Sequence, residues 1–139
     1  MSVYADSSFF VSIYLPDAHS PVALRRMRSH PRIWLTPFHE AELANAIAQQ
    51  VFRGSMSLAD ADQTHRNIES NRAAWVSVDF PEAAFRGAAQ LARTYVPKLG
   101  TRTLDSLHVA CALDLGAREF WTFDERQAKL AKAAGLKVA

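Results

Sequence analysis

Several features common in other protein classes are missing from this sequence. It has a single cysteine, Cys111, which excludes an internal disulfide and a thiolate zinc cluster and is expected to be a small core residue. No apolar run approaches the roughly 20 residues that a membrane-spanning helix needs. The start of the chain, MSVYADSS, has no basic leader typical of a signal peptide. These absences predict a cytoplasmic protein without a membrane partner.

The motifs of several enzyme classes are missing as well. The five glycines form neither a G-x-G-x-x-G turn nor a Walker loop, and there is no G-x-S-x-G elbow. His39 and Glu42 make only an H-x-x-E fragment, so the HExxH pattern of zinc hydrolases is absent. Ser7 and Ser8 follow an expected strand but have no evident histidine partner, which argues against a serine nucleophile.

What is present is an ordinary globular composition. Of the 139 residues, 49% are apolar and 22% charged, and the formal net charge is +2. A chain of this length can bury a sizeable core, so one domain over residues 1–139 is expected. The small positive charge permits a polyanionic partner without requiring one.

Expected strands and helices alternate along the chain. Strands are expected at 3–5, 33–35, 75–80, 119–123 and 136–138, and helices at 20–30, 37–52, 57–71, 101–115 and 124–134, with another beginning at Pro81. The run FFVSIYL leads to a turn at Pro16–Asp17. Helices between strands are crossover connections, which predicts an α/β fold with a mainly parallel sheet covered on both faces.

Three acids lie where expected elements begin or end. Asp6 directly follows the first strand, Asp124 follows the strand at 119–123, and Asp105 opens a helix. Each has an ordinary structural explanation, such as an N-cap or a favourable place near a helix dipole, and Gln127 would complete a capping box with Asp124. Yet Asp105 shares its helix face with apolar Val109, and in parallel sheets ligands bind beyond the carboxyl ends of the strands.

A fourth acid, Glu42, lies about a turn and a half inside its helix, beside an apolar stripe. Helical phase places neighbouring Glu40 toward solvent. Inward carboxylates need a cation, and no lysine or arginine stands beside Asp6 in the sequence. Carboxylate oxygens select hard divalent ions, so Mg²⁺ or Mn²⁺ is favoured over zinc.

The order of these acids resembles PIN-domain ribonucleases, in particular the VapC-type toxins of bacterial toxin–antitoxin pairs. The segments that carry the resemblance are VYADSSFFVSIYL, TPFHEAELANAI, RTLDSLHVACAL and FWTFDERQAKLAKAAGL, and it covers essentially the whole chain. It implies a PIN-like α/β/α sandwich, a metal-dependent endoribonuclease activity, a homodimer, and a cognate antitoxin that blocks the acidic groove.

Carried over residue by residue, the resemblance makes four acids the catalytic and metal-binding cluster: Asp6, Glu42, Asp105 and Asp124. Asp6 and Asp105 are then the direct ligands of Mg²⁺ or Mn²⁺, and Thr122 is a supporting polar group. Either one or two ions fit four carboxylates, and the identity of the RNA is left open.

Arg102, three residues before Asp105, is expected near the phosphate that is cut. The three tryptophans lie in strand-like contexts and are expected to pack in the core rather than to stack on bases. Two alternatives remain: a catalytically silent PIN-like module that binds RNA or protein, and, less favoured, a haloacid-dehalogenase-type phosphatase. The phosphatase needs D-x-D after the first strand, where this chain has Asp6–Ser7–Ser8.

Overall fold

The computed structural model describes residues 2–139, which contain a five-stranded, wholly parallel sheet. The strands are β1 (Ser2–Ala5), β2 (Arg32–Leu35), β3 (Val76–Ser77), β4 (Glu119–Trp121) and β5 (Lys137–Val138). Their order across the sheet is β3-β2-β1-β4-β5, so β1 lies at the centre between β2 and β4. This arrangement confirms the expected α/β fold with a parallel sheet.

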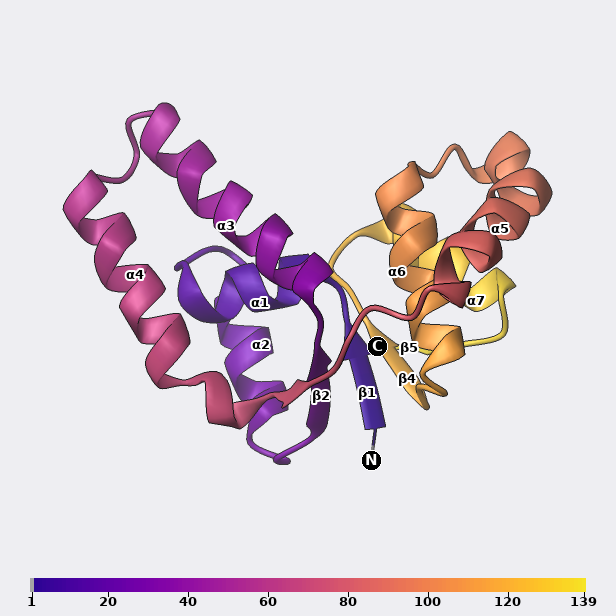
Figure 1. The fold of residues 1–139 in the computed structure, drawn as a ribbon, viewed down its shortest axis with the longest axis horizontal. Helices are drawn as coiled ribbons and strands as arrows, with labels where there is room; N and C mark the ends of the chain where they lie inside the picture. The colour runs from indigo at the N-terminus through magenta and orange to yellow at the C-terminus, as the bar shows by residue number, and fades with distance from the viewer. Residues whose placement is uncertain (1) are drawn as a thin grey trace.

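Helices cover both faces of the sheet (Figure 1). They are α1 (Ser7–Tyr14), α2 (Ser20–Met27), α3 (Pro37–Phe52), α4 (Leu58–Ser70), α5 (Ala83–Leu99), α6 (Thr103–Asp114) and α7 (Glu125–Ala133). Helices α1 to α4 lie on one side and α5 to α7 on the other, and α3 and α4 extend away from the sheet as a pair. The α/β/α sandwich is therefore confirmed. No helix of residues 2–139 is both long and apolar enough to cross a bilayer.

The strands supply side chains to two separate cores because successive residues of a strand point to opposite faces. On β1, Val3 and Ala5 pack with the first set of helices, whereas Tyr4 packs with the second. On β4, Trp121 joins the first core and Phe120 the second. Trp75 and Trp121 are buried, as expected of core residues, and so is Cys111.

Helix α1 is the element that the sequence pattern does not predict. Asp6 caps it, and its carboxylate accepts the backbone N–H of Phe9 at 3.3 Å. Phe9 and Phe10 are both fully buried, so apolar residues occupy neighbouring helical positions instead of one stripe. A helix that is apolar on most sides shows no period of 3.6 residues, which is why FFVSIYL gives no helical signal.

Helix α3 is fixed to the central strand through its first turn. Thr36 Oγ1 accepts the backbone N–H of His39 at 3.4 Å, and the Thr36 N–H donates to His39 Nδ1 at 3.0 Å, a reciprocal capping box. The Nε2–H of His39 donates to the carbonyl of Ala5 at 2.8 Å. His39 is fully buried, and its pKa is lowered to about 3. Burial is the largest cause of this shift, and nearby His108 is the second. These bonds hold α3 above the carboxyl end of β1.

Several boundaries differ from expectation: α2 ends at Met27 and not at 30, and β4 ends at Trp121 and not at 123. Only Val76 and Ser77 form the third strand, which was expected at 75–80, because β3 is an edge strand that pairs with β2 alone. Helix α5 begins at Ala83, two residues after Pro81.

Candidate active site at the carboxyl ends of the strands

Asp6 lies at the carboxyl end of the central strand and is 5% exposed. Its carboxylate accepts hydrogen bonds from the hydroxyls of Ser8 at 2.5 Å and Thr122 at 2.7 Å, besides the Phe9 N–H. Burial raises the pKa of Asp6 above its usual value, and these hydrogen bonds only partly oppose that effect. No lysine or arginine of the described residues forms an ion pair with it. The site therefore holds a buried carboxylate that lacks a cation.

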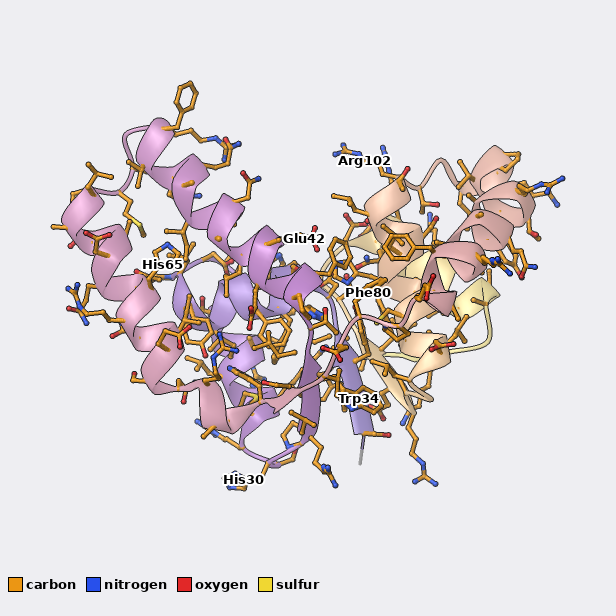
Figure 2. All side chains as sticks on the ribbon, viewed as in Figure 1. His30, Trp34, Glu42, His65, Phe80 and Arg102 are labelled. Atoms are coloured by element: carbon orange, nitrogen blue, oxygen red, sulfur yellow. The ribbon has the colours of Figure 1, made fainter. Side chains whose placement is uncertain are left out.

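Glu42 reaches this region from α3 and is 25% exposed. Its Oε1 accepts the hydroxyl of Ser7 at 2.7 Å and contacts Nε2 of His108. Burial raises the pKa of Glu42, but the His108 and Ser7 hydrogen bonds outweigh it, and the net pKa is lowered. Figure 2 shows Glu42 directed from α3 toward the side of α6.

The neighbouring acid, Glu40, serves a different contact. Its Oε1 pairs with Nη1 of Arg72 at 2.6 Å, and Arg72 also pairs with Glu69 at 3.0 Å. This network joins α3 to the end of α4 and the residues that follow it. Of the two glutamates, Glu42 is the one whose side chain faces the region of Asp6.

Asp105 and Asp124 form the more open part of the site. Asp105 Oδ2 accepts the backbone N–H of Arg102 at 2.9 Å within the first turn of α6. Asp124 caps α7 by accepting the backbone N–H of Gln127 at 3.0 Å, as the sequence predicts. Both acids line an open pocket of about 500 Å³, together with Arg102, Phe123, Glu125 and Arg126. In Figure 2, Arg102 lies at the N-terminal end of α6.

A buried glutamine connects the two parts. Thr122 Oγ1 lies 2.7 Å from Asp6 Oδ2 and 2.9 Å from Gln127 Oε1, and Gln127 Nε2 lies 3.5 Å from Asp105 Oδ1. The second half of the expected capping box is wrong, because the N–H of Asp124 donates to Thr122 at 3.0 Å and not to Gln127. The side chain of Gln127 is thus used to join Asp6 to Asp105.

Thr122 and Gln127 link Asp6 to Asp105, but the four acids do not converge on one point. In the described residues, no three side chains of histidine, cysteine, aspartate or glutamate are arranged closely enough to hold a metal ion. The chemistry of the donors nevertheless fits a hard divalent ion, because the four predicted site residues offer carboxylate oxygens only. Buried Asp6 is the one that most needs such a charge.

Sequence reasoning missed the role of His108, which it leaves as a helix-face residue. His108 is 3% exposed, and its Nδ1 lies 2.8 Å from the hydroxyl of Tyr4. Its Nε2 lies 3.4 Å from Ser7 Oγ, so Ser7 does have a histidine neighbour. Ser7 donates to Glu42, however, and the same nitrogen of His108 faces Glu42, so no serine nucleophile is activated. No motif could have shown this, because 101 residues separate Ser7 from His108.

The PIN domain family profile matches residues 3–133 of this chain. The chain belongs to the PIN domain family. This membership agrees with the fold, since Asp6 follows β1, Asp124 follows β4, and Glu42 and Asp105 lie on α3 and α6, which flank the parallel sheet. None of the curated proteins matches the chain in sequence.

Solved structures with the same fold include three from bacterial systems. VapC20 from Mycobacterium tuberculosis, a sarcin-ricin-loop-cleaving toxin, superposes with a TM-score of 0.71 at 15% identity, covering 96% of this chain and 95% of that one. FitAcB from Neisseria gonorrhoeae superposes with a TM-score of 0.74 at 17% identity, covering 98% of this chain and 95% of that one. VapBC2 from Rickettsia felis, bound to a promoter DNA fragment, superposes with a TM-score of 0.70 at 16% identity, covering 100% of this chain and 98% of that one.

Proposed function

We propose that this PIN-domain protein is a Mg²⁺- or Mn²⁺-dependent endoribonuclease that hydrolyses RNA phosphodiester bonds. The observation that carries the proposal is the buried carboxylate of Asp6, which has no ion-pair partner among residues 2–139 and lies at the carboxyl ends of the strands. Such a group is costly to bury unless a cation joins it. Membership of the PIN domain family supports a nuclease.

Within this proposal, Asp6 and Asp105 bind the divalent ion, and Glu42 and Asp124 complete the site. A divalent ion bound there supplies activation of water and neutralisation of charge on the phosphoryl oxygens. Thr122 orients the carboxylate of Asp6 by its hydrogen bond. Arg102, which lines the open pocket beside Asp105, holds an RNA phosphate.

We also propose that the protein is the toxin of a toxin–antitoxin pair and forms a homodimer. The support is its fold, which it shares with the VapC20 toxin and with the VapBC2 complex. The antitoxin would cover the acidic pocket and so prevent access of RNA to Asp105 and Asp124. Action on cellular RNA would take place in the cytoplasm.

The test is cleavage of a mixed RNA pool by the purified protein with Mg²⁺, with Mn²⁺ and with EDTA. Asp6→Asn and Asp105→Asn are each expected to lower the rate at least about 100-fold, because each removes a carboxylate from the metal site. Asp114→Asn is the matched control, since Asp114 is an exposed acid on the same helix as Asp105. Cleavage that persists in EDTA, or equally in both site variants, would contradict the proposal.

A second function, a catalytically silent module that binds RNA or protein, is favoured by one observation. The four acids do not converge closely enough to hold an ion as they stand. In that case the folded protein binds RNA, yet no divalent ion gives cleavage.

A further inference from the structure

A buried hydrogen-bonded network lies beneath Glu42 and is formed by four elements. Tyr4 comes from β1, Ser7 from α1, Glu42 from α3 and His108 from α6. Tyr4 is fully buried and its hydroxyl lies 2.8 Å from His108 Nδ1, while His108 Nε2 contacts Glu42 Oε1. The proposed catalytic chemistry assigns no role to Tyr4 or His108.

One donor in this network follows from the chemistry of the acceptor that it faces. An ionised carboxylate only accepts, so the hydrogen between His108 and Glu42 must be on Nε2. Burial raises the pKa of Tyr4 well above its usual value, so the phenol keeps its proton and can donate it to Nδ1. The imidazole therefore carries a hydrogen on Nε2, the nitrogen that faces Glu42.

Neighbouring rings fix the orientation of this imidazole. Phe38 stacks on His108 with ring centroids 4.4 Å apart and planes inclined by 28°. His39, itself held by Ala5 and Thr36, lies 5.2 Å from the His108 ring. With both ring nitrogens bonded and one face stacked, His108 can present Nε2 in one direction only.

We propose that His108 is a positioning residue that holds the Glu42 carboxylate in the candidate site. Ser7 and His108 both bond to Oε1, so Oε2 is the oxygen left to face a cation or water. A flexible glutamate side chain with one oxygen fixed in this way loses its freedom before the ion arrives. This inference rests on the proposed nuclease function.

The first test compares His108→Gln with His108→Leu. Glutamine keeps an amide N–H close to the position of Nε2, whereas leucine keeps the apolar bulk and has no donor. His108→Leu is expected to lower kcat and the affinity for Mn²⁺, measured by calorimetry, about 10–100-fold, with KM for RNA unchanged. His108→Gln is expected to recover most of that loss. Equal losses in both variants, or a change in KM alone, would overturn the proposal.

The second test asks whether His108 acts through Glu42. In a double-mutant cycle, His108→Leu added to Glu42→Gln should cause no further loss of Mn²⁺ affinity or kcat. Fully additive losses would show that His108 acts elsewhere. Circular dichroism and thermal unfolding of each variant identify any that have lost the fold. If His108→Leu has lost it, the comparison of His108→Gln with the wild type decides.

The third test needs neither metal nor RNA. The ¹⁵N spectrum of the His108 ring in the metal-free protein should show a protonated Nε2. It should also shift in the Glu42→Gln variant. A bare Nε2 would overturn the assignment. Wild-type protein that gives this spectrum and binds Mn²⁺ through Glu42, yet cleaves no RNA, would contradict the proposed function but not the positioning of Glu42.

Discussion

The two sides of the candidate site are built differently. On the closed side, both oxygens of Asp6 and Oε1 of Glu42 are bonded to the hydroxyls of Ser7, Ser8 and Thr122 and to the ring of His108. On the open side, Asp105 and Asp124 line a pocket of about 500 Å³ that also exposes the side chains of two arginines.

The difference separates two requirements of a hydrolytic site. Burying a carboxylate lowers the free energy of unfolding, so the closed side fixes geometry and charge before any ligand binds, at a loss of stability. The open side keeps acids and arginines in water, where a large polyanion can approach. Substitutions on the closed side should therefore change stability and catalysis together, and those on the open side should change catalysis or binding alone.

The sharpest contrast is between Asp6→Asn and Asp105→Asn. Both are expected to lose at least about 100-fold in cleavage, but only Asp6→Asn should raise the free energy of unfolding, by about 1 kcal/mol, because it removes a buried charge. Asparagine can accept from Ser8 and donate to Thr122, whose hydroxyl then donates to Gln127. Asp105→Asn should stay within about 0.5 kcal/mol of wild type.

Urea denaturation at pH 7 measures this split. The folded-state pKa of Asp6 is raised, so the destabilising contribution of this one carboxylate disappears as the pH falls and Asp6 takes up its proton. The advantage of Asp6→Asn should therefore shrink at acid pH. Equal destabilisation of the two variants at neutral pH would remove the distinction between a closed and an open side.

The next largest effect concerns His39, which lies beneath Glu42 on the closed side. Its folded pKa is about 3, whereas an unfolded histidine titrates near 6.5, so between these values only the unfolded chain binds the proton. Stability from this group is present above pH 6.5 and is lost as the pH falls, at about 1.4 kcal/mol per pH unit.

Urea denaturation of wild type and His39→Gln at pH 7, 6, 5 and 4 tests this. The glutamine variant should start less stable by about 1–3 kcal/mol, since the Thr36 N–H loses its acceptor. Its stability should then fall less steeply with acid than that of the wild type. Parallel curves would mean that His39 is not the neutral link between α3 and β1.

The smallest effect is expected on the open side, at Arg102. Arg102→Gln should raise KM for RNA several-fold, leave kcat and stability nearly unchanged, and reduce the slope of log Kd against log salt by about 0.7. Arg118→Gln is the matched control, because exposed Arg118 precedes β4 at the opposite end of the sheet. Equal salt slopes for the two variants would show that Arg102 does not bind an RNA phosphate.

Local signals in the sequence predict much of the fold. Thr36, Ser57 and Asp124 each cap the helix that the pattern assigns to them, since an N-cap needs only its own turn. Helix α1 could not be predicted because its apolar residues surround it. The pattern overestimates the length of the edge strand β3 because it does not show which of its residues pair with a neighbouring strand.

The candidate site is predictable only in part, for the same reason. Asp6 and Asp124 follow strands, and parallel strands end at one edge, so their gathering follows from the order of elements. The contacts of Tyr4, His108 and Gln127 depend on tertiary packing between distant segments, for which one sequence contains no periodic signal.

The central place of β1 also determines when the site can exist. Asp6 bonds to Thr122, 116 residues later, because β1 pairs with β4 across a sheet whose middle strand is made first. Protein synthesis at about 5–20 residues per second means that a growing chain carries Asp6 and Glu42 for several seconds before Asp105 and Asp124 are added. On the proposed function, a nascent chain cannot cut the RNA of the ribosome that is making it.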